Sequence, residues 1–301
     1  MIFQPSYIKL YQNGSLQQRA ALAKKHLSKC TLCPHECRVN RIKNVGFCKA
    51  TDKALVSSYG PHFGEEPELV GENGSGTVFF GFCNMRCVFC QNFELSFGGE
   101  GDLISNESLA IIMTSLQNDF HCHNINFVSP TLFVPHILEA IVIAVEKGLK
   151  IPLVYNCGGY EKLETLQLLD GIIDVYMPDF KFILDEKGIK YSNVKDYPSH
   201  VKQSLIEMDR QVDGLKVDDR GIAYKGLIIR HLMMPGGLEE TKLILEFIAN
   251  ELSKDCLVNI MDQYYPSHQA HKYKEINQEI KEQDWEKALS YATKLGLRTV
   301  L

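Results

Sequence analysis

Short apolar runs, rich in β-branched and aromatic residues, alternate along the chain with segments of helical periodicity. The runs are nearly continuous, which is typical of strands that are buried on both faces of a parallel sheet. They predict six strands, at 76–81, 124–129, 152–156, 174–179, 226–235 and 257–263. The helical patterns predict helices at about 15–27, from a cap at Ser105 or Asn106 through Leu116, and at about 136–147, 238–253 and 278–295.

This order of elements predicts an α/β fold with a helix-covered parallel sheet, either doubly wound or a barrel of β/α units. In both arrangements ligands bind at the carboxyl ends of the strands. Polar residues with chemical capability follow or end four successive predicted strands: Cys83, Cys87 and Cys90, then Ser129 and Thr131, then Asn156, then Asp179 and Lys181. Arg230 lies within the fifth strand. Core packing does not require this pattern, so it predicts a functional site at that edge.

Composition excludes several classes of protein. The chain has 301 residues, of which 45% are hydrophobic, and a net charge of −5, so we expect no nucleic-acid or anionic-membrane partner. The first residues are polar and lack the apolar core of a signal peptide, which predicts a cytoplasmic protein. The most apolar helical run, "HILEAIVIAVEKG", is too short for a membrane span and contains glutamates.

Ten cysteines are many for a chain without an export signal, and seven of them lie in two tight groups. Short Cys-x-x-Cys spacings in such a chain favour metal binding over disulfides. The other three, Cys122, Cys157 and Cys256, are scattered in apolar settings and are interpreted as buried thiols.

The first group is "GFCNMRCVFCQN" (81–92), with Cys83, Cys87 and Cys90. Sets of thiolates select zinc or iron–sulfur clusters. Three thiolates can hold three irons of a four-iron cube and leave the fourth iron open for a substrate or cosubstrate, much as a catalytic zinc keeps an open position. A structural zinc knuckle or buried thiols are the alternatives.

The second group is Cys30, Cys33, Cys37 and Cys48. Four thiolates close a tetrahedron, so a structural zinc is the simplest interpretation, and an auxiliary four-iron cluster fits the same ligand count. The stretch that follows this group, "ALVSSYGPHFGEEPELVGENGSG", is expected to begin as a short strand and to continue as a Gly-, Pro- and Glu-rich connecting loop. We therefore predict an N-terminal helix and metal-binding segment over 1–70, followed by the main domain with its C-terminal helix over 71–301.

Several motifs together resemble one known family. They lie in collinear order over roughly residues 30–270: "CTLCPHECRVNR", "GPHFGEEP", "GSGTVFFGFCNMRCVFCQN", "NINFVSPTLFVP", "VYNCGGYE", "YMPDFK" and "IRHLMMPG". Cys-x-x-x-Cys-x-x-Cys with an aromatic residue before the last cysteine resembles the signature of the radical S-adenosylmethionine superfamily. The whole set is similar to its pyruvate formate-lyase activating enzyme-like branch with an N-terminal cysteine segment.

The resemblance implies a partial (β/α)6 barrel and a [4Fe-4S] cluster on Cys83, Cys87 and Cys90. In this family S-adenosylmethionine binds the open iron and is cleaved to a 5′-deoxyadenosyl radical that abstracts hydrogen. The implied contacts of that cofactor are the aromatic Phe89 near the adenine and the strand-end residues Asn156, Asp179, Lys181 and Arg230. A structural ion pair is the alternative for the last three.

The chain departs from the family pattern after the second strand. Activating enzymes have Gly-Gly-Glu there, which holds the cofactor amino group, whereas this chain reads Ser129-Pro130-Thr131. The hydroxyls of Ser129 and Thr131, together with backbone carbonyls, are the groups left for that contact.

The expected function is hydrogen abstraction from a protein or peptide substrate or from another unactivated C–H bond. A glycyl radical on a partner enzyme is the family-style product, and a reducing partner of the flavodoxin or ferredoxin type is implied. Radical modification of a peptide or small molecule is the alternative enzymatic hypothesis. A non-enzymatic metal-binding adaptor, with both cysteine groups structural, is the alternative from another class.

Overall fold

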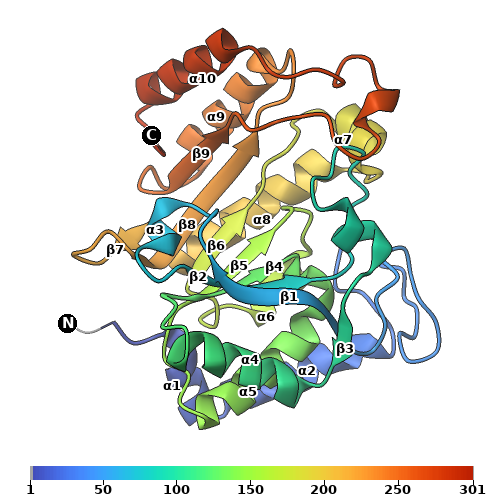
Figure 1. Ribbon diagram of the computed structural model, residues 1–301, viewed down its shortest axis with the longest axis vertical. Coiled ribbons are helices and arrows are strands. Elements are labelled where there is room, and N and C mark those ends of the chain that lie inside the picture. The colour runs from blue at the N-terminus through green and yellow to red at the C-terminus, as the bar shows by residue number, and fades with distance from the viewer. Residues whose placement is uncertain (1–2, 301) are drawn as a thin grey trace.

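The centre of the fold is one mostly parallel sheet, seen in the computed structural model of residues 3–300 (Figure 1). Its strands are β1 (Ala54–His62), β2 (Ser75–Phe80), β3 (Asp102–Ile104), β4 (Ile125–Val128), β5 (Leu153–Cys157), β6 (Val175–Pro178), β7 (Lys216–Val217), β8 (Ala223–Leu232), β9 (Leu257–Met261) and β10 (Arg298–Thr299). The order is β10-β9-β8-β6-β5-β4-β2-β1-β3, and β7 pairs with β8 outside this path. Neighbours from β2 to β10 are parallel, whereas β1 is antiparallel to β2 and to β3.

Helices connect the parallel strands and cover the sheet. They are α1 (Ser6–Gln12), α2 (Ser15–Lys24), α3 (Pro67–Val70), α4 (Asn106–Asn118), α5 (Val134–Glu146), α6 (Leu163–Leu168), α7 (Asp185–Ser192), α8 (Tyr197–Val212), α9 (Leu238–Glu251) and α10 (Glu282–Lys294). In Figure 1, α1, α2, α4 and α5 lie together at one end of the molecule, and α9 and α10 lie beside β9 at the other end. Within residues 3–300 we find no helix with the length and apolarity that crossing a bilayer demands.

The sequence prediction of an α/β fold with a mostly parallel sheet is confirmed. The six predicted strands correspond to β2, β4, β5, β6, β8 and β9, and the five predicted helices to α2, α4, α5, α9 and α10. Ser105 is the N-cap of α4, because its Oγ accepts a hydrogen bond from the backbone N–H of Ser108 at 3.1 Å. The partial barrel and the division near residue 70 stay predictions.

Two parts of the fold differ from the sequence analysis. The stretch from residue 54, expected to begin as a short strand and then become a loop, is a longer strand, β1, which continues through Gly60 and Pro61 because it pairs with β2 as far as His62. Helix α8 was not expected, although its buried residues Val201 and Leu205 recur at helical spacing. Its short flanking elements, α6 and α7, were not expected either.

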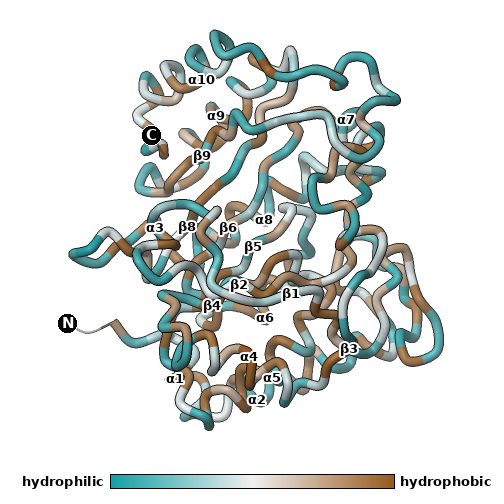
Figure 2. The backbone as a smooth tube through the Cα atoms, in the orientation of Figure 1, coloured by the Kyte–Doolittle hydropathy of each residue, from teal (hydrophilic) through white to brown (hydrophobic). Residues whose placement is uncertain are grey.

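Buried apolar residues lie on both faces of the sheet. The larger cluster joins strand residues such as Tyr155 and Tyr176 to the covering helices. A smaller cluster contains Val154 and Val175, whose side chains point to the opposite face, and it is completed by Leu69 from α3. Figure 2 shows the matching concentration of hydrophobic residues along β8 and β9 and on α4 and α5. The sheet is therefore buried on both faces, as its continuous apolar strands require.

Helix α3 and the residues just before it are anchored on the sheet. The carbonyl of Leu69 accepts a hydrogen bond from Asn124 Nδ2 at 2.9 Å, and Asn259 Nδ2 donates to Glu66 Oε1 at 3.0 Å. Since Asn259 belongs to β9 and Asn124 directly precedes β4, this segment bridges distant strands. The same anchoring brings Glu65 to the carboxyl ends of the strands.

Candidate functional site

A cavity of about 260 Å³ opens at the carboxyl ends of the parallel strands. Residues from the ends of β2, β4, β5, β6, β8 and β9 all contribute to its wall. The predicted site residues that line it are Cys83, Cys87, Phe89, Cys90, Ser129, Asn156, Asp179, Lys181 and Arg230. The structure thus brings together residues that span about half the chain.

The cysteine loop that follows β2 forms one side of this cavity. Cys83 and Cys87 line the cavity, whereas Arg86 and Val88 line a second cavity on the other side of the loop. Two backbone hydrogen bonds tie the loop to the end of α7, from Arg86 N to the Ser192 carbonyl at 2.9 Å and from Val88 N to the Tyr191 carbonyl at 2.8 Å. These bonds fix which side chains face the cavity.

Burial makes the thiols of the loop difficult to ionise. It raises the pKa of Cys83 to about 12 and the pKa of Cys87 to about 11, and the neighbouring thiols add to the effect. The ammonium of Lys181 acts in the opposite direction on the pKa of both. A bound metal cation would reverse this balance, because coordination deprotonates a thiol. The thiols are therefore suited to a cationic ligand.

An ion-pair network forms the opposite wall. Arg230 Nε donates to Asp179 Oδ1 at 3.0 Å, and Arg230 Nη2 donates to Asn156 Oδ1 at 2.6 Å. Lys181 Nζ donates to the second carboxylate oxygen, Asp179 Oδ2, at 2.5 Å. Burial alone would raise the pKa of Asp179, but Lys181 and Arg230 outweigh it and hold that pKa below its usual value. Asp179 is therefore ionised at neutral pH.

Glu65 completes the network, and sequence reasoning did not place it there. Its carboxylate accepts from Arg230 Nη1 at 3.3 Å and from Asn156 Nδ2 at 3.4 Å, and its side chain is only 7% exposed. Burial raises the pKa of Glu65, and the charge of Arg230 acts against this rise. The motif "GPHFGEEP" suggested only a loop near the site, because Glu65 and Arg230 are 165 positions apart.

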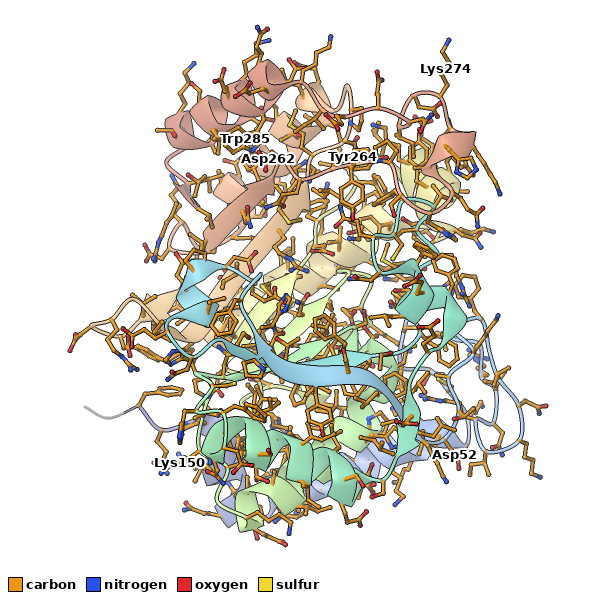
Figure 3. The ribbon with its side chains drawn as sticks, in the orientation of Figure 1. Asp52, Lys150, Asp262, Tyr264, Lys274 and Trp285 are labelled. Atoms are coloured by element: carbon orange, nitrogen blue, oxygen red, sulfur yellow. The ribbon has the colours of Figure 1, made fainter. Side chains whose placement is uncertain are left out.

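Phe89 and Ser129 both lie in the cavity wall. Phe89 is 4% exposed and packs edge-on against Phe182, with ring centroids 6.0 Å apart, and against Tyr264 at 6.2 Å. Figure 3 labels Tyr264 in the segment that follows β9. These two aromatic contacts hold the ring of Phe89 in place beside the cysteines.

Ser129 has a left-handed backbone with φ 57°, and its N–H donates to the Asn156 carbonyl at 2.9 Å.

Thr131 does not line this cavity. Its side chain lies in the core, 2% exposed, and its hydroxyl donates to Glu161 Oε1 at 2.7 Å. The second oxygen, Glu161 Oε2, accepts from the Tyr155 hydroxyl at 3.0 Å. The structure therefore separates Thr131 from the other predicted cofactor residues.

The N-terminal cysteines lie in an irregular segment after α2. Cys30, Cys33 and Cys48 are buried, and Cys37 is half-buried with its Sγ 4.0 Å from the Cys30 carbonyl oxygen. Burial raises the pKa of Cys30 and of Cys48, and the thiol of Cys37 raises both further. Across residues 3–300, no three or more His, Cys, Asp or Glu side chains form a group that could hold a metal ion.

The two cysteine segments contact each other directly. His35 Nε2 donates to the Asn84 carbonyl at 2.8 Å, and Arg86 Nη2 donates to the Phe47 carbonyl at 2.9 Å. The rings of His35 and Phe47 also pack together, with centroids 4.1 Å apart. The N-terminal segment is thus docked on the cysteine loop.

Comparison with known proteins gives one strong similarity. No family profile matches the chain. The chain is 34% identical over 293 residues to the uncharacterized protein MJ0674 of Methanocaldococcus jannaschii, covering 94% of this chain and 79% of that protein.

Two solved structures show weaker likenesses. A domain of pyruvate-formate lyase-activating enzyme from Bacteroides vulgatus has a TM-score of 0.39 at 14% identity, over 52% of this chain and 84% of that one. Streptococcus suis SuiB bound to S-adenosylmethionine has a TM-score of 0.49 at 13% identity, over 73% of this chain and 48% of that one. Both likenesses are too weak to assign an activity.

Replacing Arg230 tests the buried network. We expect Arg230→Gln to lower the free energy of unfolding by about 3–5 kcal/mol, because Asp179 and Glu65 would stay buried without their guanidinium partner. The control is Arg220→Gln, since Arg220 pairs with Asp218 but is 70% exposed, and we expect a change under about 1 kcal/mol. Urea denaturation measures both, and equal effects would contradict the network's role.

The buried Glu161 predicts a pH dependence of stability. Burial raises its pKa from 4.5 to about 7, although hydrogen bonds from Thr131 and Tyr155 act against the rise. Between pH 4.5 and about 7 the folded protein keeps a proton on Glu161 that the unfolded chain has lost. The contribution of protonated Glu161 to the free energy of unfolding is therefore full below about pH 4.5 and disappears as the pH rises through about 7.

We therefore expect Glu161→Gln to gain stability relative to the wild type as the pH rises through this window. Urea denaturation at several pH values measures the difference. Glu164→Gln serves as the control, because the Glu164 side chain is 70% exposed, and it should follow the wild type. A constant difference between Glu161→Gln and the wild type would show that Glu161 does not titrate there.

Proposed function

We propose that this chain, which belongs to the same family as the protein MJ0674 of Methanocaldococcus jannaschii, is a radical S-adenosylmethionine enzyme. The observation that carries the proposal is the strand-end cavity, in which Cys83, Cys87 and Cys90 face a buried ion-pair network. A structural metal site needs neither an open cavity nor such a network. This argues against the non-enzymatic adaptor.

The residues present fit an iron–sulfur cluster with one open iron. Three thiols on one loop match three of the four corners, and the thiols of Cys83 and Cys87 need a cationic ligand to ionise. When bound, the reduced cluster supplies one-electron cleavage of S-adenosylmethionine to methionine and a 5′-deoxyadenosyl radical, which abstracts hydrogen from the substrate. Cys83, Cys87 and Cys90 would hold the cluster.

The residues of the opposite wall would orient the cofactor. The planar fork of Arg230 suits paired oxygens such as a carboxylate or the ribose hydroxyls, and Asn156 lies within its reach. Asp179 holds Lys181 and Arg230 in place, and Phe89 offers an apolar face for the adenine. Ser129 is the remaining hydroxyl at the position of the missing Gly-Gly-Glu. We leave Thr131 out of this set because its hydroxyl contacts Glu161.

The substrate class follows from the motif resemblance. We propose hydrogen abstraction from a protein or peptide, with a glycyl radical on a partner enzyme as the family-style product. Modification of a peptide or small molecule shares the same cleavage step. A one-electron donor of the flavodoxin or ferredoxin type would supply the electron.

The N-terminal cysteines would form a second, structural metal site. Cys30, Cys33, Cys37 and Cys48 supply four thiolates, which is the closed donor set of a structural zinc. We propose zinc in this site, within an N-terminal extension over 1–70 that precedes the catalytic domain over 71–301. Zinc binding would require the four thiols to draw together, since no three metal-binding side chains within residues 3–300 are already grouped around one ion. Its role would be to hold the segment that docks on the cysteine loop.

Substitution of one loop cysteine tests the assignment of the cluster. In anaerobically reconstituted protein reduced with dithionite, Cys87→Ala should abolish 5′-deoxyadenosine formation, a larger loss than the roughly 10–100-fold caused by removing an outer-shell partner of a metal. Cys256→Ala is the matched control, because Cys256 is a buried thiol away from the cavity lining, and it should keep wild-type activity. Product formation by Cys87→Ala would refute the assignment.

Metal analysis tests the second site. A variant that lacks Cys83, Cys87 and Cys90 should bind zinc and no iron, and additional loss of Cys30 and Cys33 should remove the zinc. Iron retained in the first variant would instead show an auxiliary iron–sulfur cluster at the N-terminal cysteines.

A further inference from the structure

The charge of the chain is unevenly distributed. Residues 1–53 contain ten Lys and Arg against the two acidic residues Glu36 and Asp52, whereas the whole chain has 32 basic and 37 acidic residues. Residues 1–53, which include the N-terminal cysteine segment, are therefore strongly basic within an acidic protein. Such a local field attracts acidic partners despite the overall net charge.

Part of this basic segment lines a second cavity, of about 560 Å³, on the outer side of the cysteine loop. We call it the outer basic cavity. Its wall includes Phe47 and Lys49 from the N-terminal segment, Arg86 and Val88 from the cysteine loop, and Lys190 from α7, and no carboxylate residue lines it.

The cations of the outer basic cavity are only partly neutralised. Lys190 is paired with Glu275. Arg86 donates to the Phe47 carbonyl and lies 5.0 Å from the centroid of the Phe97 ring, so it is held in place by neutral groups. Lys49 is exposed next to Cys48. In the part of the chain that the structure describes, neither Lys49 nor Arg86 forms a salt bridge. The Lys49 ammonium is exposed, and the Arg86 guanidinium is half-buried, so the two residues leave positive charge that no carboxylate within residues 3–300 neutralises.

The cysteine loop is a thin wall between the two cavities. Cys87 lines the strand-end cavity, while its neighbours Arg86 and Val88 line the outer basic cavity. A second connection between the two cavities runs through the end of α7. Cys87 Sγ lies 3.1 Å from Ser192 Oγ, and the residue after Ser192, Asn193, lines the outer basic cavity. Because electron transfer slows steeply with distance, a carrier docked at this cavity would have a short path to the loop thiols.

We propose that the outer basic cavity is the docking surface for a small acidic flavoprotein of the flavodoxin class. The proposal rests on the proposed function, because it assumes a cluster on the loop cysteines. One electron passes from the reduced flavin to the cluster, so the flavin is oxidised by one electron and the cluster is reduced by one. Attraction between the acidic carrier and Lys49 and Arg86 holds the two proteins together.

Direct binding tests the docking surface without depending on catalysis. With the reconstituted protein and purified oxidised flavodoxin at low ionic strength, Lys49→Glu should raise the dissociation constant about tenfold, since it reverses one of the two positive charges that would attract the acidic carrier. Lys150→Glu makes the same charge change at an exposed lysine that does not line this cavity (labelled in Figure 3), and we expect less than about a twofold effect. Added salt should weaken binding of the wild type.

Activity with two reductants separates this proposal from the proposed function. Lys49→Glu should keep the wild-type rate of 5′-deoxyadenosine formation with dithionite and lose most of it with limiting reduced flavodoxin. Unchanged flavodoxin binding in Lys49→Glu, or equal weakening in Lys150→Glu, would overturn the docking surface while leaving dithionite cleavage intact. Failure of dithionite cleavage in the wild type would instead overturn the proposed function.

A basic surface also attracts nucleic acid, so an RNA oligonucleotide is included as a competitor. We expect it to leave flavodoxin binding unchanged. Displacement of flavodoxin by the RNA, together with RNA binding that is lost in Lys49→Glu, would overturn the proposal in favour of a nucleic-acid surface.

Discussion

The arrangement of the site depends on the buried guanidinium of Arg230. A buried charge is tolerated only when it is paired and hydrogen-bonded, and Arg230 meets this condition through Asp179, Asn156 and Glu65. These three partners come from the end of β6, from β5 and from the segment before α3. One side chain therefore fixes three distant pieces of the chain at the carboxyl ends of the strands.

The cysteine loop shows how a short segment can serve two surfaces. Its backbone is bonded to Tyr191 and Ser192 at the end of α7, so its side chains cannot exchange sides. Cys87 then faces the strand-end cavity, and Arg86 faces the N-terminal cysteine segment, where it donates to the Phe47 carbonyl. The docked N-terminal segment thereby adds positive charge directly behind the thiols.

The sequence predicted the parallel sheet and most of the cavity residues because both depend on local signals. Continuous apolar runs mark the buried strands, and a residue that ends such a strand must reach the same edge as its neighbours. Glu65 could not be found in this way, since its partner Arg230 is brought to it only by the folded sheet. The sequence could not show that Thr131 lies outside the cavity lining, because its position depends on the left-handed backbone of Ser129 and the short 3-10 helix that follows, in which Thr131 is buried against Glu161. The net charge is an average over the chain and does not show that residues 1–53 are basic.

The charges on the wall opposite the cysteine loop restrict which ligands the strand-end cavity can bind. Asp179 is bound to Lys181 and Arg230 at once, so a ligand with only a carboxylate would compete with Asp179 for both cations. A ligand that carries an ammonium as well as a carboxylate could pair with both signs of the network without leaving a buried charge unpaired. The methionine part of S-adenosylmethionine has this zwitterionic character. The balance of two carboxylates and two cations around Asn156 therefore favours such a cofactor over a simple anion.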